Sequence, residues 1–225
     1  MSLTRRSFYR VVVGFLVLLG TSWASAGVIV YDNTSTPTTG TVIPALEKGF
    51  WPFSQFHPYE FQGDSITLAR TERTICRFVL MISSSEYTVL DTLTVRFYSQ
   101  DGPWPASDYI WSATTTNVVV DGPRAVVFDI EPPYVVVPDD LTWAASANSL
   151  VAGLATYDPP TVGYSPIYDD DRGYWFDLDD TEGWIPLDLG DDMVANFGCR
   201  LVAIPEPATA LLLVSGALFA TRRRR

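Results

Sequence analysis

The densest group of side chains able to do chemistry is an acidic stretch between residues 169 and 192. Oxygen ligands at this density suit Ca²⁺, which takes about six to eight of them. The candidate ligands are Asp169, Asp170, Asp171, Asp177 and Asp179. A loop starting at Asp169 lacks the glycine that an EF-hand has at its sixth position. The alternative is a solvated acidic turn between strands, because aromatic residues are interleaved with the acids: Tyr174, Trp175, Phe176 and Trp184.

The chain has two cysteines, Cys76 and Cys199, each on the apolar face of a predicted strand. In an oxidising compartment they can form a disulfide if their strands are neighbours. The bridge would close a loop of about 120 residues and contribute roughly 4 kcal/mol in the chain-entropy account. The alternative is two separately buried thiols that pack as small apolar groups. Two cysteines and one histidine argue against a structural zinc site.

A nucleophilic triad would have to use His57, because it is the only histidine in the chain. It lies between Phe56 and Pro58 in an irregular segment, and no nucleophile-elbow pattern is present. Paired carboxylates can hydrolyse glycosidic bonds, but some pair is inevitable among so many acids. We therefore assign no catalytic residue, and calcium is the only cofactor that the sequence suggests.

A body of short β-strands would position these groups. Residues 27–204 are rich in Val, Thr, Tyr, Phe and Trp, and short alternating runs are separated by Gly, Pro, Asp and Ser. We expect one all-β domain, an antiparallel two-sheet sandwich that is jelly-roll-like, with a hairpin formed by 65–69 and 74–82. The other predicted strands are 28–31, 93–97, 109–113, 117–120, 125–130, 141–145, 151–157 and 194–203.

An aromatic segment from Pro44 to Gln62 precedes the hairpin. It carries Phe50, Trp51, Phe53, Phe56, Tyr59 and Phe61. One interpretation is a long arm that buries its rings against the domain, and the other is a platform for a ligand.

The charge of the body limits its partners. Three of the 15 basic residues lie in the first ten positions, four lie at the C-terminus, and one of the 26 acids lies in the tail. Residues 27–204 therefore carry eight basic and 25 acidic residues, a net charge of −17. This charge disfavours nucleic acid and anionic lipid surfaces as partners, and leaves cations and neutral polysaccharides.

Residues 1–26 have the pattern of a signal peptide. A basic region with Arg5, Arg6 and Arg10 precedes the apolar run Val11–Gly20. Ala24 and Ala26 form a small-residue cleavage site, so we expect the mature chain to begin at Gly27. The segment from Thr4 to Arg10 also resembles a twin-arginine export signal, which is the alternative to Sec export.

The last 21 residues combine a Pro205-Glu206-Pro207 element, the apolar run Ala208–Ala220 and the four arginines 222–225. As a helix, the thirteen-residue run would span about 20 Å, and a hydrocarbon core is about 30 Å thick. Local thinning and snorkelling arginine side chains can make up the difference. The prolines prevent the helix from extending backwards. On these grounds alone the tail can be an ordinary C-terminal membrane anchor.

The order of these three parts resembles the PEP-CTERM sorting signal of Gram-negative bacteria. The resemblance covers about a tenth of the chain and implies recognition by an exosortase, a membrane protease that acts near Pro205, Glu206 and Pro207. It implies export, anchoring by a C-terminal helix, and then a place at the cell surface or outside the cell of a bacterium that makes extracellular polysaccharide. It implies no activity, because the signal is attached to many unrelated domains.

The body resembles uncharacterised exported β-sandwich proteins that carry the same tail, in segments such as Gly63–Ala69, Thr92–Tyr98, Leu141–Trp143 and Asn196–Arg200. We expect a non-enzymatic surface or extracellular-matrix protein, flanked by an N-terminal signal helix and a C-terminal hydrophobic helix. The alternatives are a carbohydrate-binding module and a secreted glycan-acting enzyme. Exposed Trp and Tyr rings on one sheet face would favour the module.

Overall fold

The computed structural model describes residues 27–34, 50–53, 61–101, 104–157, 160–165, 174–177, 184–186 and 196–205. Ile29–Ala203 forms one compact unit. The predicted signal helix and C-terminal helix lie outside the described ranges. Within those ranges no helix has the length and apolarity needed to cross a membrane.

The first sheet has eight strands and is centred on β4 (Thr74–Ser84). β14 pairs with residues 75–80 of β4, and β7 pairs with residues 77–82, so these two strands lie on opposite sides of it. β8 joins β7 on its side of β4, and β2 pairs with β10. The partners are β1 (Val28–Asp32), β14 (Cys199–Ala203), β10 (Ala152–Tyr157), β13 (Asn196–Phe197), β2 (Phe50–Pro52), β7 (Arg124–Asp129) and β8 (Val135–Val136).

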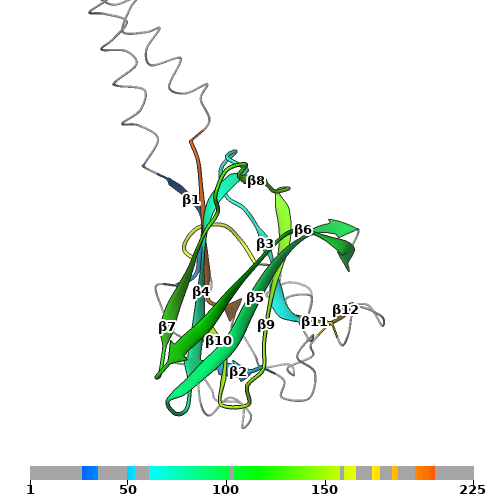
Figure 1. The fold of residues 1–225 in the computed structure, drawn as a ribbon. Coiled ribbons are helices and arrows are strands. Elements are labelled where there is room, and N and C mark those ends of the chain that lie inside the picture. The colour runs from blue at the N-terminus through cyan, green and yellow to red at the C-terminus, as the bar shows by residue number, and fades with distance from the viewer. Residues whose placement is uncertain are drawn as a thin grey trace, which may run out of the picture. The chain divides into compact units, whose positions relative to one another are not determined.

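The second sheet has six strands in the order β12-β11-β3-β9-β5-β6. Its two longest strands, β5 and β6, are consecutive in the sequence and pair antiparallel, with register shifts near Tyr98 (Figure 1). Their residues are rich in Thr, Val and aromatic side chains, which favour a pleated, half-buried surface. The strands are β12 (Trp184–Pro186), β11 (Tyr174–Asp177), β3 (Phe61–Thr67), β9 (Asp140–Ala147), β5 (Thr88–Asp101) and β6 (Trp104–Val120).

Alternation along the strands builds the core between the sheets. Leu93, Val95 and Phe97 of β5 are fully buried, as the period-two pattern predicts. Phe78 of β4 packs against two rings of the other sheet, Phe97 at 5.2 Å and Trp143 at 5.5 Å between ring centroids. The described part is therefore all-β, with two antiparallel sheets whose apolar faces contact each other as in a sandwich.

Most predicted strands are found, with three differences. Residues 109–113 and 117–120 belong to one strand, β6, and the last predicted strand is interrupted at Gly198 between β13 and β14. The predicted hairpin of 65–69 with 74–82 is wrong, because β3 and β4 belong to different sheets. The segment between them passes from one sheet to the other instead of turning back.

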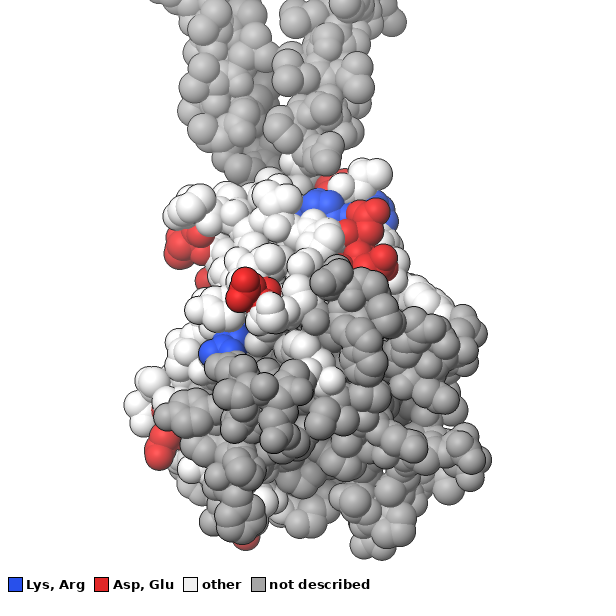
Figure 2. Space-filling model, turned by 90° about the vertical axis from the view of Figure 1, so that its right-hand side faces the viewer, with Lys and Arg blue, Asp and Glu red and all other residues white. Residues whose placement is uncertain are grey.

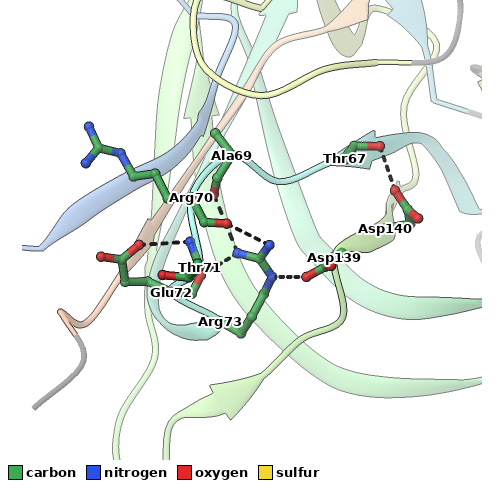
Figure 3. A network of polar contacts seen from close by, with 8 residues as sticks. All are labelled: Thr67, Ala69, Arg70, Thr71, Glu72, Arg73, Asp139 and Asp140. Atoms are coloured by element: carbon green, nitrogen blue, oxygen red, sulfur yellow. Dashed lines mark hydrogen bonds and ion pairs between the residues drawn. The ribbon is translucent and has the colours of Figure 1, made fainter. Parts of the chain in front are cut away.

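The side chain of Arg73 holds this crossover in place (Figure 3). Its Nη1 donates to the carbonyl oxygens of Glu72 at 2.9 Å and Ala69 at 3.5 Å, and its Nη2 donates to that of Arg70 at 2.9 Å. Its Nε donates to Asp139, just before β9, at 2.6 Å. Arg70 has a φ of 64°, the left-handed region in which the chain reverses direction.

Main-chain contacts fasten the same corner to the start of β9. The Leu68 amide donates to the carbonyl of Asp139 at 2.8 Å, and the Val137 amide donates to that of Arg73 at 3.0 Å. Thr67 donates its hydroxyl proton to Asp140 at 2.6 Å. In a hairpin these carbonyl groups would accept hydrogen bonds from main-chain N–H groups. In this crossover the guanidinium of Arg73 donates to them instead.

We expect Arg73→Ala to lower the free energy of unfolding by about 1–3 kcal/mol, because it leaves partly buried carbonyls without a charged donor. Asp139→Asn is the matched control. It keeps the three carbonyl contacts and removes only an ion pair whose acid is 78% exposed, so its cost should stay below about 1 kcal/mol. Urea unfolding followed by tryptophan fluorescence measures both, and equal losses would contradict the role of the carbonyl contacts.

Candidate functional site

Asp64 is a fully buried carboxyl group in the interior of the sandwich. It lies directly opposite Trp143 in the pairing of β3 with β9. It is two residues before Ile66, so the two side chains point to the same face of the strand. Neither carboxyl oxygen makes a hydrogen bond of normal geometry to any described residue, and the same holds for Nε1 of Trp143. Buried polar groups that lack well-formed hydrogen bonds are rare in folded proteins, so this pair is an unusual feature of the described interior.

Burial raises the pKa of Asp64 well above its usual value, while the main-chain N–H of Ser65 and the hydroxyl of Ser165 partly oppose the shift. Desolvation penalises the carboxylate more than the neutral acid. The interior therefore favours a protonated Asp64, which has one donor and acceptor capacity to offer.

A glycine lets β3 and β9 approach each other beside this group. A Cβ added at Gly63 would overlap the main-chain carbonyl oxygen of Trp143. On the opposite face of the two strands, the hydroxyls of Ser65 and Thr142 are bonded at 2.8 Å and are buried as well. Both faces of the β3–β9 pair thus carry buried polar groups at this point.

Cys199 lies near the same interior group. Burial raises the pKa of its thiol well above the usual value, the ionised forms of Asp64 and Asp32 raise it further, and the nearby indole N–H of Trp143 lowers it. A thiol in such surroundings is a poor nucleophile, because its thiolate form is disfavoured. Its place in the fold is that of a small apolar residue.

The predicted disulfide between Cys76 and Cys199 is not formed, and both cysteines are free. Their strands are neighbours, but Cys199 lies opposite Leu80, four residues from Cys76 and therefore about 13 Å along the strand. A disulfide needs Cα atoms closer than about 7 Å.

A β-bulge explains why the alternation pattern misplaced Cys76. The register shifts where Val202 faces Arg77 and Ala203 faces Ile75, so Cys76 is the extra residue. Ile75 is buried whereas Cys76 is only half-buried, and its Sγ lies 3.4 Å from the carbonyl of Val202. The two thiols therefore differ in burial as well as in position along the strands, because Cys199 is fully buried.

A second polar site joins the first and last strands of the unit. Nε and Nη2 of Arg200 both contact Oδ2 of Asp32 at 2.9 Å, and Nη2 also donates to the Thr34 hydroxyl at 2.9 Å. Thr34 donates its amide and hydroxyl protons to Oδ1 of Asp32 at 2.9 and 2.8 Å. Burial alone would raise the pKa of Asp32, but these hydrogen bonds and the charge of Arg200 hold it below its usual value.

Asn33 completes this connection through its side-chain amide. Its Nδ2 donates to the carbonyl of Phe197 at 2.9 Å, and its Oδ1 accepts from the amide of Cys199 at 2.6 Å. The amide thereby bridges the interruption at Gly198, whose own main chain bonds Ala155 and Met81. Together, Asp32, Asn33, Thr34 and Arg200 form what we call the terminal clamp.

Aromatic side chains also gather on the outer face of the second sheet. The guanidinium carbon of Arg96 lies 4.0 Å from the ring centre of Phe61 and 4.8 Å from that of Tyr109, which is 52% exposed. Trp184 is half-buried and meets Tyr98 edge-on at 4.8 Å.

The described tryptophan side chains do not form the exposed row expected of a sugar-binding face. Trp143 is fully buried, and Trp111 is half-buried against Phe97 at 4.6 Å. The side chains of Trp104 and Trp175 lie outside the described structure. On the face drawn in Figure 2, the described acidic and basic groups stand singly or in small groups, without a continuous patch of either sign.

Most of the predicted site residues lie outside the described part of the chain. The signal-cleavage residues Ala24 and Ala26, the single histidine His57, and Glu206 and Pro207 of the tail lie outside the described residues, and Pro205 is the last residue described. The predicted calcium ligands Asp169, Asp170, Asp171 and Asp179 also lie outside, and only the main chain of Asp177 is described, in β11. Within the described part, no three His, Cys, Asp or Glu residues are grouped so as to hold a metal ion.

Comparisons with protein-family models, with curated proteins and with solved structures found no match for this chain. Sequence reasoning missed Asp64 and the terminal clamp. The sequence does contain a signal for Asp64. It lies two residues before Ile66 and four before Leu68, which places its side chain on their inward face if the segment is a strand. The bonds by which the clamp joins the two ends of the unit had no local signal, since they connect residues more than 160 positions apart.

We expect Asp64→Asn to change how stability depends on pH. The pKa of Asp64 in the folded protein is above its unfolded value, so its favourable contribution is complete below about pH 3.9 and is lost as the pH rises through the folded-state value. Asparagine cannot ionise. Relative to wild type, the variant should therefore become more stable with rising pH, by about 1.4 kcal/mol per pH unit between the unfolded-state and folded-state pKa values, and the difference should level off above the folded-state pKa.

Urea unfolding of the two proteins at a series of pH values measures this difference, and circular dichroism checks that the variant keeps its β structure. A difference between the two that is independent of pH would show that Asp64 ionises without cost in the folded state.

Proposed function

We propose that the protein is an exported, non-enzymatic β-sandwich protein of the cell surface or extracellular matrix, delivered by its C-terminal sorting segment. The observation that carries this proposal is the ordered tail of Pro205-Glu206-Pro207, the apolar run Ala208–Ala220 and four terminal arginines. An exosortase-like membrane protease is the partner that this tail fits. The protein is held in the membrane by the apolar run and then becomes part of a polysaccharide-rich surface.

The terminal clamp supports a body that survives processing at both ends. β1 and β14 are neighbours in the first sheet, and the clamp joins residues 32–34 to Arg200. Cleavage before Gly27 and again near Pro205 would leave both strands and all clamp residues in place. The released part would therefore keep the interactions that close it.

The strand order supports a jelly roll as the form of this body. The first sheet contains the order β1-β14-β4-β7, and the second contains β3-β9-β5-β6. Successive strands thus pass repeatedly between the sheets, as in two Greek keys rolled together. Jelly rolls serve many functions, so the fold alone supports only a stable scaffold.

A carbohydrate-binding module is the second candidate, favoured by one observation. The ring of Tyr109 is 52% exposed on a sheet face and is held by Arg96, which suits stacking on a sugar. The burial of Trp143 and the partial burial of Trp111 and Trp184 argue for the matrix role instead.

The test is the intact mass of the protein from its native host, in the membrane fraction and in the culture medium. We expect medium protein to begin at Gly27 and end near Pro205 to Pro207, because the protease separates body from tail there. Glu206→Ala should leave the tail attached and the protein in the membrane, and Thr221→Ala, which leaves the Pro-Glu-Pro element intact, is the control. A full-length C-terminus found only in membranes would reduce the tail to an ordinary anchor.

A further inference from the structure

The long strand β6 forms one edge of the second sheet. Within the described residues it pairs with β5 and with no other strand. Residues 109–120 contain no charged residue, no histidine and no proline. An edge strand exposes a row of unpaired main-chain groups, and natural proteins usually protect such edges with charges, prolines or short length. Residues 109–120 have none of these three protections, and their irregularities are a register shift that leaves Ile110 unpaired with β5 and a φ of 55° at Asn117.

From residue 109 to residue 117, the side chains of β6 are at least partly accessible to solvent on both faces of the strand. The outward residues Ser112, Thr114 and Thr116 are exposed. The inward residues are only half-buried, whereas their cross-strand partners Leu93, Val95 and Phe97 on β5 are completely buried. The inward residues are Trp111, Ala113 and Thr115.

The opposite situation is found at β7, an edge of the first sheet. This strand has only six residues and begins and ends with charged residues, Arg124 and Asp129. Asp129 is paired with Arg77 at 2.6 Å, and Arg124 donates to the carbonyl of Val119 near the end of β6. β7 is thus a protected edge, and the open part of β6 is residues 109–118.

Charge favours a second copy of the chain as the occupant of this edge. The body carries a net charge of −17, so two copies repel each other over most of their surfaces. Twelve successive uncharged residues on an edge strand let two copies approach without placing like charges opposite each other. Two identical strands can pair antiparallel about a two-fold axis, which gives a closed dimer.

We propose that the protein dimerises by antiparallel pairing of β6 with β6 of a second copy, which joins two six-stranded sheets into one. The pairing supplies partners to the main-chain groups of residues 109–118 and covers the half-buried inward row. It depends on the body alone, so it is independent of whether the tail is cut.

Sedimentation velocity of the full chain in a mild detergent, over a wide range of concentrations, tests the proposal. Wild type should pass from monomer to dimer as concentration rises. Thr116→Glu adds a carboxylate to the edge and should shift the sample to monomer. Thr92→Glu is the matched control, because Thr92 is exposed and lies opposite Thr116 in the register but one strand in from the edge. It should dimerise like wild type.

A second edge variant tests whether loss of the dimer is specific to the edge and is not caused by misfolding of one variant. Thr115→Lys places a charge on the inward row, where it can reach solvent in the monomer but would be covered in the dimer. Hydrogen exchange should show slower exchange for amides of residues 109–118 at high concentration. A wild type that stays monomeric, or a dimer that persists in both folded edge variants, would overturn the proposal.

Discussion

The contact on which the rest of the structure depends is the packing of Phe78 between the sheets. β4 pairs with four strands of the first sheet, β7, β8, β10 and β14, and its Phe78 packs against Phe97 and Trp143 of the second sheet. Aromatic pairs of this kind bury large apolar areas and prefer defined geometries, so they fix the distance and angle between the sheets. Asp64 lies directly opposite Trp143, one of these rings, in the pairing of β3 with β9.

The alternating pattern was sufficient to predict the fold class and most strands. Leu93, Val95 and Phe97 are buried because alternate residues of a strand point to the same face, and here that face contacts the other sheet. The hairpin of β3 with β4 was wrong for a physical reason. A short polar segment has the same local sequence pattern whether it forms a hairpin within one sheet or connects two sheets. Here the two cases are distinguished by the contact of Arg73 with Asp139, which is 66 residues away.

The candidate site was less predictable than the fold. One inserted residue at Cys76 reverses the inward and outward positions of the strand, and local sequence does not reveal a bulge that depends on the opposing strand. Asp64 follows the inward period, but acidic residues are expected in water unless they are paired. Its burial beside Trp143 reflects the meeting of strands that are distant in the sequence, which residue spacing alone does not contain.

The terminal clamp also determines when the body can fold. Asn33 and Asp32 reach partners 164 and 168 residues further along the chain, and β1 finds its neighbour β14 only in the last strand. A chain that emerges from its N-terminus therefore lacks the closing strand until nearly all of it has been made. Such distant pairings slow folding, because the loop must close before the contacts form. The order of the strands therefore means that the first sheet can be completed only after the last strand has been made.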